Sequence, residues 1–291
     1  MKLDGILLIN KEKEYTSNDV VQKIKHKFNL EKVGHTGTLD PNATGVLPLL
    51  VNNGTKLSKY LINHDKTYIA TLKLGEKTET GDREGKIIEK REIPELNKSK
   101  VLKTLNSFIG KQEQKPPMYS AIKVNGRKLY EYARDENNEL PKITVEKRNI
   151  EIYSIELINF DKDTNQIKFK VDCSKGTYIR TLCEDIAEKL GTVGHMSDLQ
   201  RTRVVNFKIE ESYKIDEIEN IEKLENYIIT FKDFFKDKET INIDPKNLEL
   251  YINGGRFITN KKDGIYNIYC EEKYIGIGIV NKKRLKREIY I

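Results

Sequence analysis

The chain has 291 residues, enough for about two domains. Hydrophobic residues make up 37% of it and charged residues 33%, with a formal net charge of +7. The composition is polar, yet it contains too many aliphatic residues and tyrosines for a disordered chain. Its apolar stretches, such as Val46 to Val51, are too short to span a bilayer. The opening residues lack the pattern of a signal peptide, so we expect a cytoplasmic protein.

The cysteines predict neither a disulfide framework nor a metal site. Cys173, Cys183 and Cys270 are odd in number and include no C-x-x-C pair. The histidines show no metal-ligand spacing either. We therefore expect no bound metal.

The first elements along the chain lead into and out of a glycine-rich loop. A strand predicted from Gly5 to Asn10 precedes a helix that Ser17 or Asn18 can cap. Apolar residues recur on one face of that helix. Residues 34–45 then contain three glycines and one proline around a single acidic residue, Asp40.

Strands and helices follow without the regular alternation of a doubly wound sheet. Thr67 to Leu74 alternates between apolar and polar residues, which predicts a half-buried strand. The remaining signals are strands at 143–160 and 166–173 and helices at 101–109 and 182–190, the last ending at Gly191. This order predicts an α+β fold.

Positive charge and tyrosines concentrate between Lys98 and Arg148. This segment has twelve Lys or Arg residues and six Asp or Glu residues, a local net charge of +6, and it includes Tyr119, Tyr130 and Tyr132. Basic residues interleaved with aromatic ones are typical of nucleic-acid surfaces. A solvated lysine-rich face has the same composition, so charge alone leaves both interpretations open.

The last quarter of the chain changes character. Residues 216–226 contain five acidic residues and one lysine, and the charged run 232–239 follows; together they form the predicted linker. Residues 241–291 contain short alternating strands, five glycines and a basic end. This pattern predicts a small β-rich module.

Asp40 is the first candidate for chemistry. Pro41 restrains the residue before it towards extended geometry, so the Asp40 carboxylate would stand on a stiff loop. The glycines let a ligand approach the backbone closely. No Gly-Lys-Ser/Thr follows, which argues against a nucleotide P-loop. Taken alone, an Asp-Pro pair is more often a turn cap than a catalytic group.

Four other residues are candidates because of where they lie. Arg180 falls between a predicted strand and a helix, where a guanidinium can orient a carboxylate through paired hydrogen bonds. Alone, such an arginine is more often a structural ion-pair residue. His35, on the glycine-rich loop, is better placed for contact with a partner than for a core. Tyr68 and Tyr178, taken singly, are more typical of core tyrosines than of base-stacking residues.

Together and in order, the motifs resemble the bacterial tRNA pseudouridine-55 synthase (TruB) family. The resemblance covers almost the whole chain. It rests on Asp4-Gly5-Ile6-Leu7, Thr16-Ser17-Asn18-Asp19-Val20, the Gly34–Gly45 loop, Lys66-Thr67-Tyr68, Pro117-Met118-Tyr119-Ser120-Ala121, Lys128-Leu129-Tyr130-Glu131-Tyr132-Ala133-Arg134, Cys173-Ser174-Lys175-Gly176-Thr177-Tyr178-Ile179-Arg180 and Leu199-Gln200-Arg201-Thr202-Arg203. One such motif can arise by chance, whereas the ordered set is typical of the family.

The resemblance implies an enzyme that isomerises a uridine in the T-arm of tRNA, at position 55, to pseudouridine, with no cofactor and no metal. Asp40 matches the family's catalytic carboxylate, which attacks the sugar carbon or removes a C2′ proton. Arg180 matches the arginine that orients it, and an opposite charge close by would hold Asp40 ionised. The target nucleotide has to flip out of the arm to reach the site.

The same resemblance implies the binding residues. His35, Tyr68, Tyr178 and Leu199 match residues around the flipped uridine, and Tyr68 is also a candidate to remove the C5 proton. The expected RNA contacts are Lys66, Arg127, Lys128, Lys175 and Arg201. Phosphate contacts from the basic 98–148 region would make binding weaken with salt.

The implied architecture has two domains. Residues 1–230 would form a catalytic domain with a mixed, mainly antiparallel central sheet, flanking helices and a basic RNA-binding insertion around 98–148. Residues 240–291 would form a PUA-like RNA-binding domain. The chain would act as a monomer, with tRNA as its partner, no obligate protein partner and no membrane.

The sequence departs from the family pattern in two places. The family's Lys-Pro-x-Gly reads Lys11-Glu12-Lys13-Glu14 here, which predicts a turn of another geometry. The family's Arg-Arg-Thr-x-x-Gly-x-Phe begins with Gln200 and has Val205 at the glycine. One RNA-facing arginine is therefore absent, but no proposed catalytic residue is affected.

Two other functions would fit the same scaffold. A catalytically silent tRNA-binding or tRNA-folding protein would bind tRNA without isomerising uridine; the presence of Asp40, Tyr68 and Arg180 together counts against it. A guide-RNA-directed relative would be active only with accessory proteins and RNA, and the compact bacterial-type layout counts against that.

Overall fold

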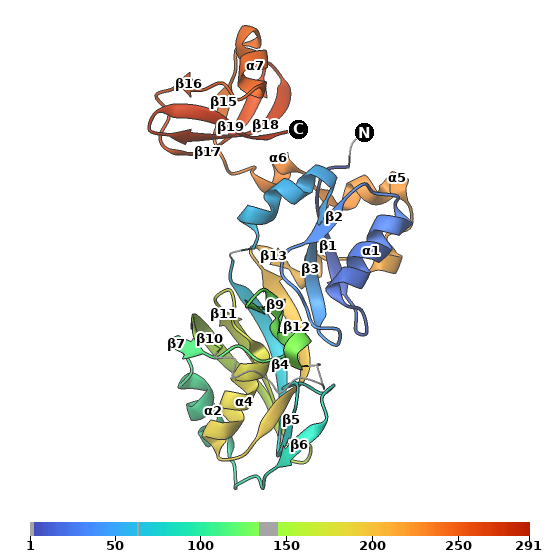
Figure 1. The fold of residues 1–291 in the computed structure, drawn as a ribbon, viewed down its shortest axis with the longest axis vertical. Coiled ribbons are helices and arrows are strands. Elements are labelled where there is room, and N and C mark those ends of the chain that lie inside the picture. The colour runs from blue at the N-terminus through green and yellow to red at the C-terminus, as the bar shows by residue number, and fades with distance from the viewer. Residues whose placement is uncertain (1–2, 63, 134–144) are drawn as a thin grey trace.

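The computed structural model describes residues 3–62, 64–133 and 145–291. Within these residues a ten-stranded sheet forms the body of an elongated molecule, and a five-stranded sheet lies at one end (Figure 1). In spatial order the large sheet runs β14 (Ile228–Ile229), β1 (Gly5–Lys11), β3 (Thr44–Val51), β12 (Gly194–Val204), β4 (Lys66–Leu74), β11 (Gln166–Cys173), β10 (Arg148–Asp161) and β7 (Gly110–Gln114), with β2 (Val33–His35) on β3 and β13 (Phe207–Lys208) on β12.

This sheet confirms the predicted α+β fold. All its pairings are antiparallel except that of β12 with β3. The inward residues of β4 and β11 are buried in alternation, as their period of two predicts. The helices α2 (Lys98–Asn106) and α4 (Ile179–Leu190) pack against each other and against β10 and β12. Gly191 ends α4 in the left-handed conformation, at φ 94°.

The parallel contact between β3 and β12 fixes the glycine-rich loop to the centre of the sheet. Gln200 lies opposite Thr44, and Arg201 lies opposite Gly45. Gly45 has a φ of +107°, and a Cβ at this position would collide with the carbonyl oxygen of Arg201. Only glycine permits this approach of the two backbones. The loop that precedes β3 is therefore tied directly to β12.

The helix α1 (Ser17–Lys27) begins one residue earlier than the predicted caps allow. Thr16 is the N-cap: its hydroxyl accepts the Asp19 N–H, and the Asp19 carboxylate accepts the Thr16 N–H. This reciprocal pair is a capping box. Ser17 is buried instead, with its hydroxyl directed to the glycine-rich loop.

Smaller elements complete the part of the molecule built on the large sheet. They are η1 (Asn52–Tyr60), the hairpin of β5 (Glu76–Thr78) and β6 (Ile87–Lys90), the hairpin of β8 (Lys123–Val124) and β9 (Arg127–Lys128), α3 (Leu129–Ala133) and η2 (Ile209–Glu211). Among the described residues, no helix is long and apolar enough to cross a membrane.

The linker predicted at 216–226 is wrong. These residues are in η3 (Ile215–Glu217), α5 (Ile221–Leu224) and η4 (Glu225–Tyr227), and the chain then pairs with β1 as β14. Ile215, Ile218 and Leu224 are buried in the main core. The acidic residues of this segment dominate its composition, but the apolar residues between them determine where it packs.

The run 232–239 also contacts the fold closely. The helix α6 (Phe231–Phe234) and Phe235 pack into a second core cluster, which includes Ile277 and Ile289 of the C-terminal sheet. That sheet has the order β15 (Thr240–Asn242), β17 (Gly264–Cys270), β18 (Lys273–Asn281), β19 (Arg284–Tyr290) and β16 (Phe257–Ile258), with α7 (Pro245–Ile252) beside it. Lys56 of η1 donates to the Tyr290 carbonyl at 3.0 Å. The C-terminal sheet is thus anchored to the part of the molecule built on the large sheet.

At each departure from the family pattern, the residue that stands in place of glycine has a left-handed backbone conformation. Glu14 has a φ of 70° and Val205 a φ of 57°. A non-glycine residue is strained there, a β-branched one most of all. The backbone carbonyl of Asp65 accepts the Val205 N–H (3.3 Å), and the Arg203 side chain donates to the Val205 carbonyl (2.7 Å). At both positions the backbone therefore has a conformation that glycine favours, although the residue is not glycine.

Replacing Ile218 with alanine tests whether the acidic segment is part of the core. Ile218 is fully buried, so Ile218→Ala should lower the free energy of unfolding by about 2–5 kcal/mol. Chemical denaturation measures this change. Glu219→Ala, at the next and exposed position, should leave stability unchanged. Equal stability of the two variants would mean that the segment is a solvated linker after all.

Candidate functional site

The centre of the candidate site is the guanidinium of Arg180, which lies between two carboxylates. Its Nε is 3.3 Å from Oδ2 of Asp40, and its Nη1 is 3.6 Å from Oδ2 of Asp82. Nη1 also donates to the Thr80 carbonyl at 3.1 Å, and Nη2 donates to the Tyr119 carbonyl at 2.9 Å. Arg180 is buried near the N-terminus of α4. With a partner for each nitrogen, its position is fixed.

Asp40 begins a four-residue turn. The Ala43 N–H donates to the Asp40 carbonyl at 3.0 Å, so Pro41 and Asn42 occupy the two central positions. Proline suits the first of these because its φ is already fixed near the required value. The Asp40 side chain remains 37% exposed. The turn therefore presents a carboxylate that is partly enclosed and still accessible.

Two buried side chains hold the backbone on either side of Asp40. Lys11 at the end of β1 donates to the Pro41 carbonyl at 2.8 Å, as well as to the carbonyls of Glu12 and Tyr15. Ser17 donates to the Leu39 carbonyl at 3.0 Å and accepts the Leu39 N–H at 2.8 Å. Sequence reasoning missed Lys11, whose only signal is a lysine at the end of an apolar strand.

Opposing effects act on the pKa of Asp40. Burial, the largest of them, raises this pKa, and the charge of Asp82 raises it further. The positive charges of Arg180 and Lys11 lower it, but the net direction is upward from the usual value. Arg180 therefore favours the ionised form, as expected, without outweighing burial.

Lys11 gives the stability of the protein a distinctive pH dependence. Burial lowers the pKa of this ammonium from its usual 10.5 to about 8. Between these values the folded chain has lost a proton that the unfolded chain still holds, so stability rises with pH. Relative to Lys11→Met, wild-type stability should therefore increase from pH 8 to pH 10, by an amount on the order of 2 kcal/mol. Denaturant titrations at both pH values measure it, and a constant difference would refute the assignment.

Tyr68 lies near this centre, and His35 lies near Arg201. Tyr68 is buried on β4, opposite Arg201 of β12, and burial raises its pKa to about 12. The charge of Asp40 is near enough to raise it further. His35 ends β2, and burial lowers its pKa, with Arg201 adding to the effect. Its Nδ1 is buried and has no hydrogen-bond partner among the described residues.

The structure does not support the expected RNA contact of Arg201. Its side chain is fully buried on the central strand β12. Nε donates to the Val46 carbonyl at 2.8 Å, and Nη2 donates to the Gly37 carbonyl at 3.2 Å. A phosphate cannot reach a guanidinium enclosed in this way. Arg201 instead ties the glycine-rich loop and β3 to β12.

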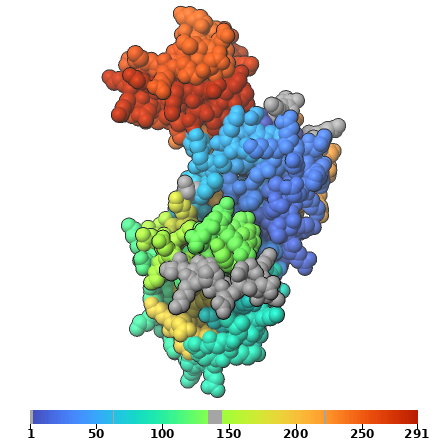
Figure 2. Space-filling view, viewed as in Figure 1, coloured from blue at the N-terminus to red at the C-terminus, as the bar shows by residue number. Residues whose placement is uncertain are grey.

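The other four basic candidates are nearer the surface. Lys66 is half-buried and donates to the His64 carbonyl at 2.7 Å, whereas Lys175 is exposed before α4. Arg127 and Lys128 form β9, with their charges over the rings of Tyr132 and Tyr130, respectively. Figure 2 shows the green β8–α3 segment on the visible face of the molecule, between the N-terminal part and the β5–β6 hairpin. The basic candidates thus divide into four residues nearer the surface and the buried Arg201.

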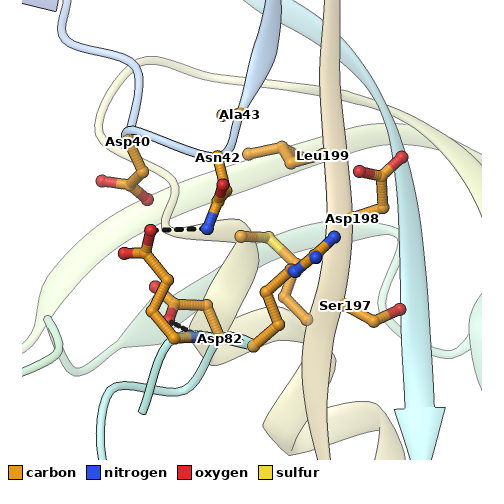
Figure 3. Close-up of a pocket in the computed structure, with 10 residues that line it drawn as sticks. Asp40, Asn42, Ala43, Asp82, Ser197, Asp198 and Leu199 are labelled. Carbon is orange, nitrogen blue, oxygen red and sulfur yellow. Dashed lines mark hydrogen bonds between the residues drawn. The ribbon is translucent and has the colours of Figure 1, made fainter. Parts of the chain in front are cut away.

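A shallow cavity opens beside Asp40 (Figure 3). Leu199 of β12 lies in its wall, next to Asp40 and Asn42. The other lining residues are Ala43, Asp82, Arg83, Glu84, Met196, Ser197 and Asp198. Tyr178 is not in this lining; it is the N-cap of α4, and the Gln114 side chain bonds its N–H and carbonyl at 2.8 and 3.0 Å.

Sequence reasoning missed the acidic residues Asp82 and Glu84. They lie in the turn between β5 and β6, where Asp82 Oδ1 accepts the Thr80 hydroxyl at 2.6 Å and the Glu84 N–H at 3.1 Å. Nothing local in the sequence marks this turn as part of a site. In the described part of the chain, no group of His, Cys, Asp and Glu side chains is arranged to hold a metal ion.

Comparison with known families identifies the chain. Residues 25–179 match the model of the TruB family pseudouridylate synthase N-terminal domain, and residues 180–231 match that of the tRNA pseudouridylate synthase B C-terminal domain. The chain belongs to the TruB family. It is 41% identical to tRNA pseudouridine synthase B of Francisella tularensis subsp. novicida over all of this chain and 98% of the relative, and 42% identical to that of Francisella philomiragia with the same coverage.

Solved structures show the same fold. A chain of a Cbf5-Nop10-Gar1 complex matches with a TM-score of 0.67 at 24% identity, over 95% of this chain and 78% of that one. A chain of an H/ACA RNP bound to a substrate RNA containing 2′-deoxyuridine also has a TM-score of 0.67, at 21% identity, over 96% and 78% of the two chains. At these identities the likeness concerns the fold.

Proposed function

We propose that Asp40 is the catalytic carboxylate with which this TruB-family chain isomerises a uridine of tRNA to pseudouridine. The reaction follows from membership of a family of tRNA pseudouridine synthases. The assignment of Asp40 is supported by one observation above all: its accessible carboxylate is paired with the buried Arg180. The reaction breaks the N1–C1′ bond, rotates the base and joins C5 to C1′.

The surroundings of Asp40 suit this chemistry. Breaking a glycosidic bond develops positive charge on the sugar, and a fixed carboxylate stabilises that charge. The same carboxylate can attack C1′ or remove a C2′ proton, and in either case it must be ionised. Arg180 and Lys11 favour the ionised form against the effect of burial. A flipped nucleotide would enter from the open side of the turn.

We assign Tyr68 to stacking on the uracil ring rather than to proton removal as a phenolate. Its pKa of about 12 keeps the phenol neutral at physiological pH. We infer that His35 contacts the substrate because its side chain is only partly buried at the end of β2. Leu199 and Tyr178 would bound the base from β12 and from the start of α4.

We propose that the target lies in the T-arm, at position 55, and that the protein reads this arm mainly through shape and backbone. The surface residues Lys66, Arg127, Lys128 and Lys175 would contact phosphates. The C-terminal sheet, residues 240–291, would be a PUA-like module for another part of the tRNA. The chain would act in the cytoplasm as a monomer without an obligate protein partner.

Neutralising Asp40 should separate catalysis from binding. Asp40→Asn should reduce turnover by at least about a thousandfold, since the reaction then lacks its carboxylate. The affinity for tRNA should stay within about twofold, because one carboxylate is not an anchor for a polyanion. Tritium release from a transcript labelled at C5 of uridine measures turnover, and filter binding measures affinity. Substantial turnover by this variant would refute the assignment.

A silent tRNA-binding protein is the other candidate function. It predicts tight binding of tRNA by the wild-type chain with no tritium release. The same pair of measurements therefore decides between the two functions before any variant is made.

The basic hairpin should contribute affinity rather than chemistry. Arg127→Ala combined with Lys128→Ala should weaken tRNA binding and reduce the slope of log affinity against log salt by about one to two. Lys168→Ala combined with Lys170→Ala removes the same charge from exposed positions on β11, outside the basic 98–148 segment, and serves as the control. Equal slopes for both double variants would mean that the hairpin is only a solvated surface.

A further inference from the structure

A hydrogen bond links the Asp40 turn to the β5–β6 turn. Nδ2 of Asn42, two residues after Asp40, donates to Oε1 of Glu84 at 2.5 Å (Figure 3). Asn42 is one of the two central residues of the Asp40 turn. The hydrogen bond of the Asn42 side chain therefore helps to hold the turn that carries the proposed catalytic carboxylate.

This bond closes a ring of contacts. From Asp40 the ring passes to Arg180 (3.3 Å) and on to Asp82 (3.6 Å). Asp82 accepts the N–H of Glu84 (3.1 Å), and Glu84 returns through Asn42 to the Asp40 turn. Both turns are also held by β12, through the pairing of Gly45 with Arg201 and through the Met196 N–H, which donates to the Gly81 carbonyl at 3.0 Å. Without the bond between Asn42 and Glu84, the side-chain link between the two turns would be the one through Arg180. With that bond, side chains join the two turns at two points.

We propose that Glu84 is a positioning residue for catalysis, which holds the Asp40 turn through Asn42 and adds its negative charge to the field at Asp40. The inference rests on the proposed role of Asp40. Glu84 itself touches neither the reacting atoms nor Arg180 in the contacts described above; it acts through Asn42 and through its charge.

The charges around Glu84 support the electrostatic part. Burial raises the pKa of Glu84, and the charges of Asp82 and Asp40 raise it further, whereas Asn42 and Arg180 lower it. Coupling between two charges is reciprocal, so an ionised Glu84 makes ionisation of Asp40 harder. The other charged groups at this cavity and turn are Lys11 on β1, Arg83 beside Glu84, and Asp198 on β12, which pairs with Lys13 at 2.7 Å.

Three variants separate the contact from the charge. Asn42→Ala removes the contact and keeps the charge, Glu84→Gln removes the charge and keeps an oxygen that can accept from Asn42, and Glu84→Ala removes both. The measurement is the single-turnover rate of tritium release from C5-labelled tRNA as a function of pH. Glu89→Ala is the matched control, because Glu89 lies on the same hairpin and bonds Arg91 instead.

Removing the contact should lower the plateau rate. Asn42→Ala and Glu84→Ala should each reduce it about fivefold, as expected for the loss of one partly solvated hydrogen bond, with tRNA affinity unchanged. The double variant should be no slower than Glu84→Ala, because both substitutions break the same bond. Glu84→Gln should lose less than Glu84→Ala, and Glu89→Ala should match the wild type.

Removing the charge of Glu84 should move the acid limb of the rate–pH profile. With Glu84 neutral, the pKa of Asp40 falls, so Glu84→Gln and Glu84→Ala should stay active to lower pH than the wild type. Asn42→Ala keeps Glu84 ionisable and should move this limb less than either Glu84 variant. If Glu84 served folding alone, replacing it would leave the acid limb of the rate–pH profile unchanged.

Wild-type rates in Asn42→Ala and Glu84→Ala, or additive losses in the double variant, would overturn the proposal. If Asp40→Asn is inactive in the same assay, such a result refutes the role of Glu84 alone. If Asp40→Asn is active, the proposed role of Asp40 fails as well.

Discussion

One buried guanidinium shared by two carboxylates is the interaction on which the candidate site depends. Arg180 joins Asp40 from the glycine-rich loop to Asp82 from the β5–β6 turn, and it also binds the carbonyls of Thr80 and Tyr119. Segments from distant parts of the chain therefore meet at a single residue of α4. A buried arginine without these partners would carry a large desolvation penalty, so the segments and the arginine hold one another in place.

Two buried basic residues limit what the net charge of the chain says about RNA binding. Lys11 and Arg201 are almost or fully buried, and each donates to backbone carbonyls of the segments that flank Asp40. Carbonyl oxygens that would otherwise be unsatisfied in the interior accept from these side chains. Both residues count towards the net charge of +7, yet neither faces a phosphate. The surface that RNA meets is less basic than the composition suggests.

The sequence predicted what depends on local periodicity and missed what depends on distant pairing. The alternation in β4 and the glycine after α4 are local signals, and both elements were found. Ile218 was misassigned to a linker because its acidic neighbours dominate the composition of that segment. Asp40 alone resembled a turn cap, and only the ordered motifs indicated catalysis. Glu84 could not be found, because its partner Asn42 is 42 residues away and nothing local marks either residue.

The cavity beside Asp40 is lined mainly by acidic residues among its charged groups, whereas the basic candidates for RNA contact lie outside its lining. Asp40, Asp82 and Glu84 make the cavity acidic, although Arg180 offsets part of that charge. A polyanion gains nothing by approaching carboxylates, so under the proposed function the affinity for tRNA would come from basic residues such as the exposed Lys175. Binding energy gained there can offset the cost of bringing a flipped nucleotide to an anionic centre. In the proposed reaction, the charge of Asp40 becomes favourable where positive charge develops in the transition state.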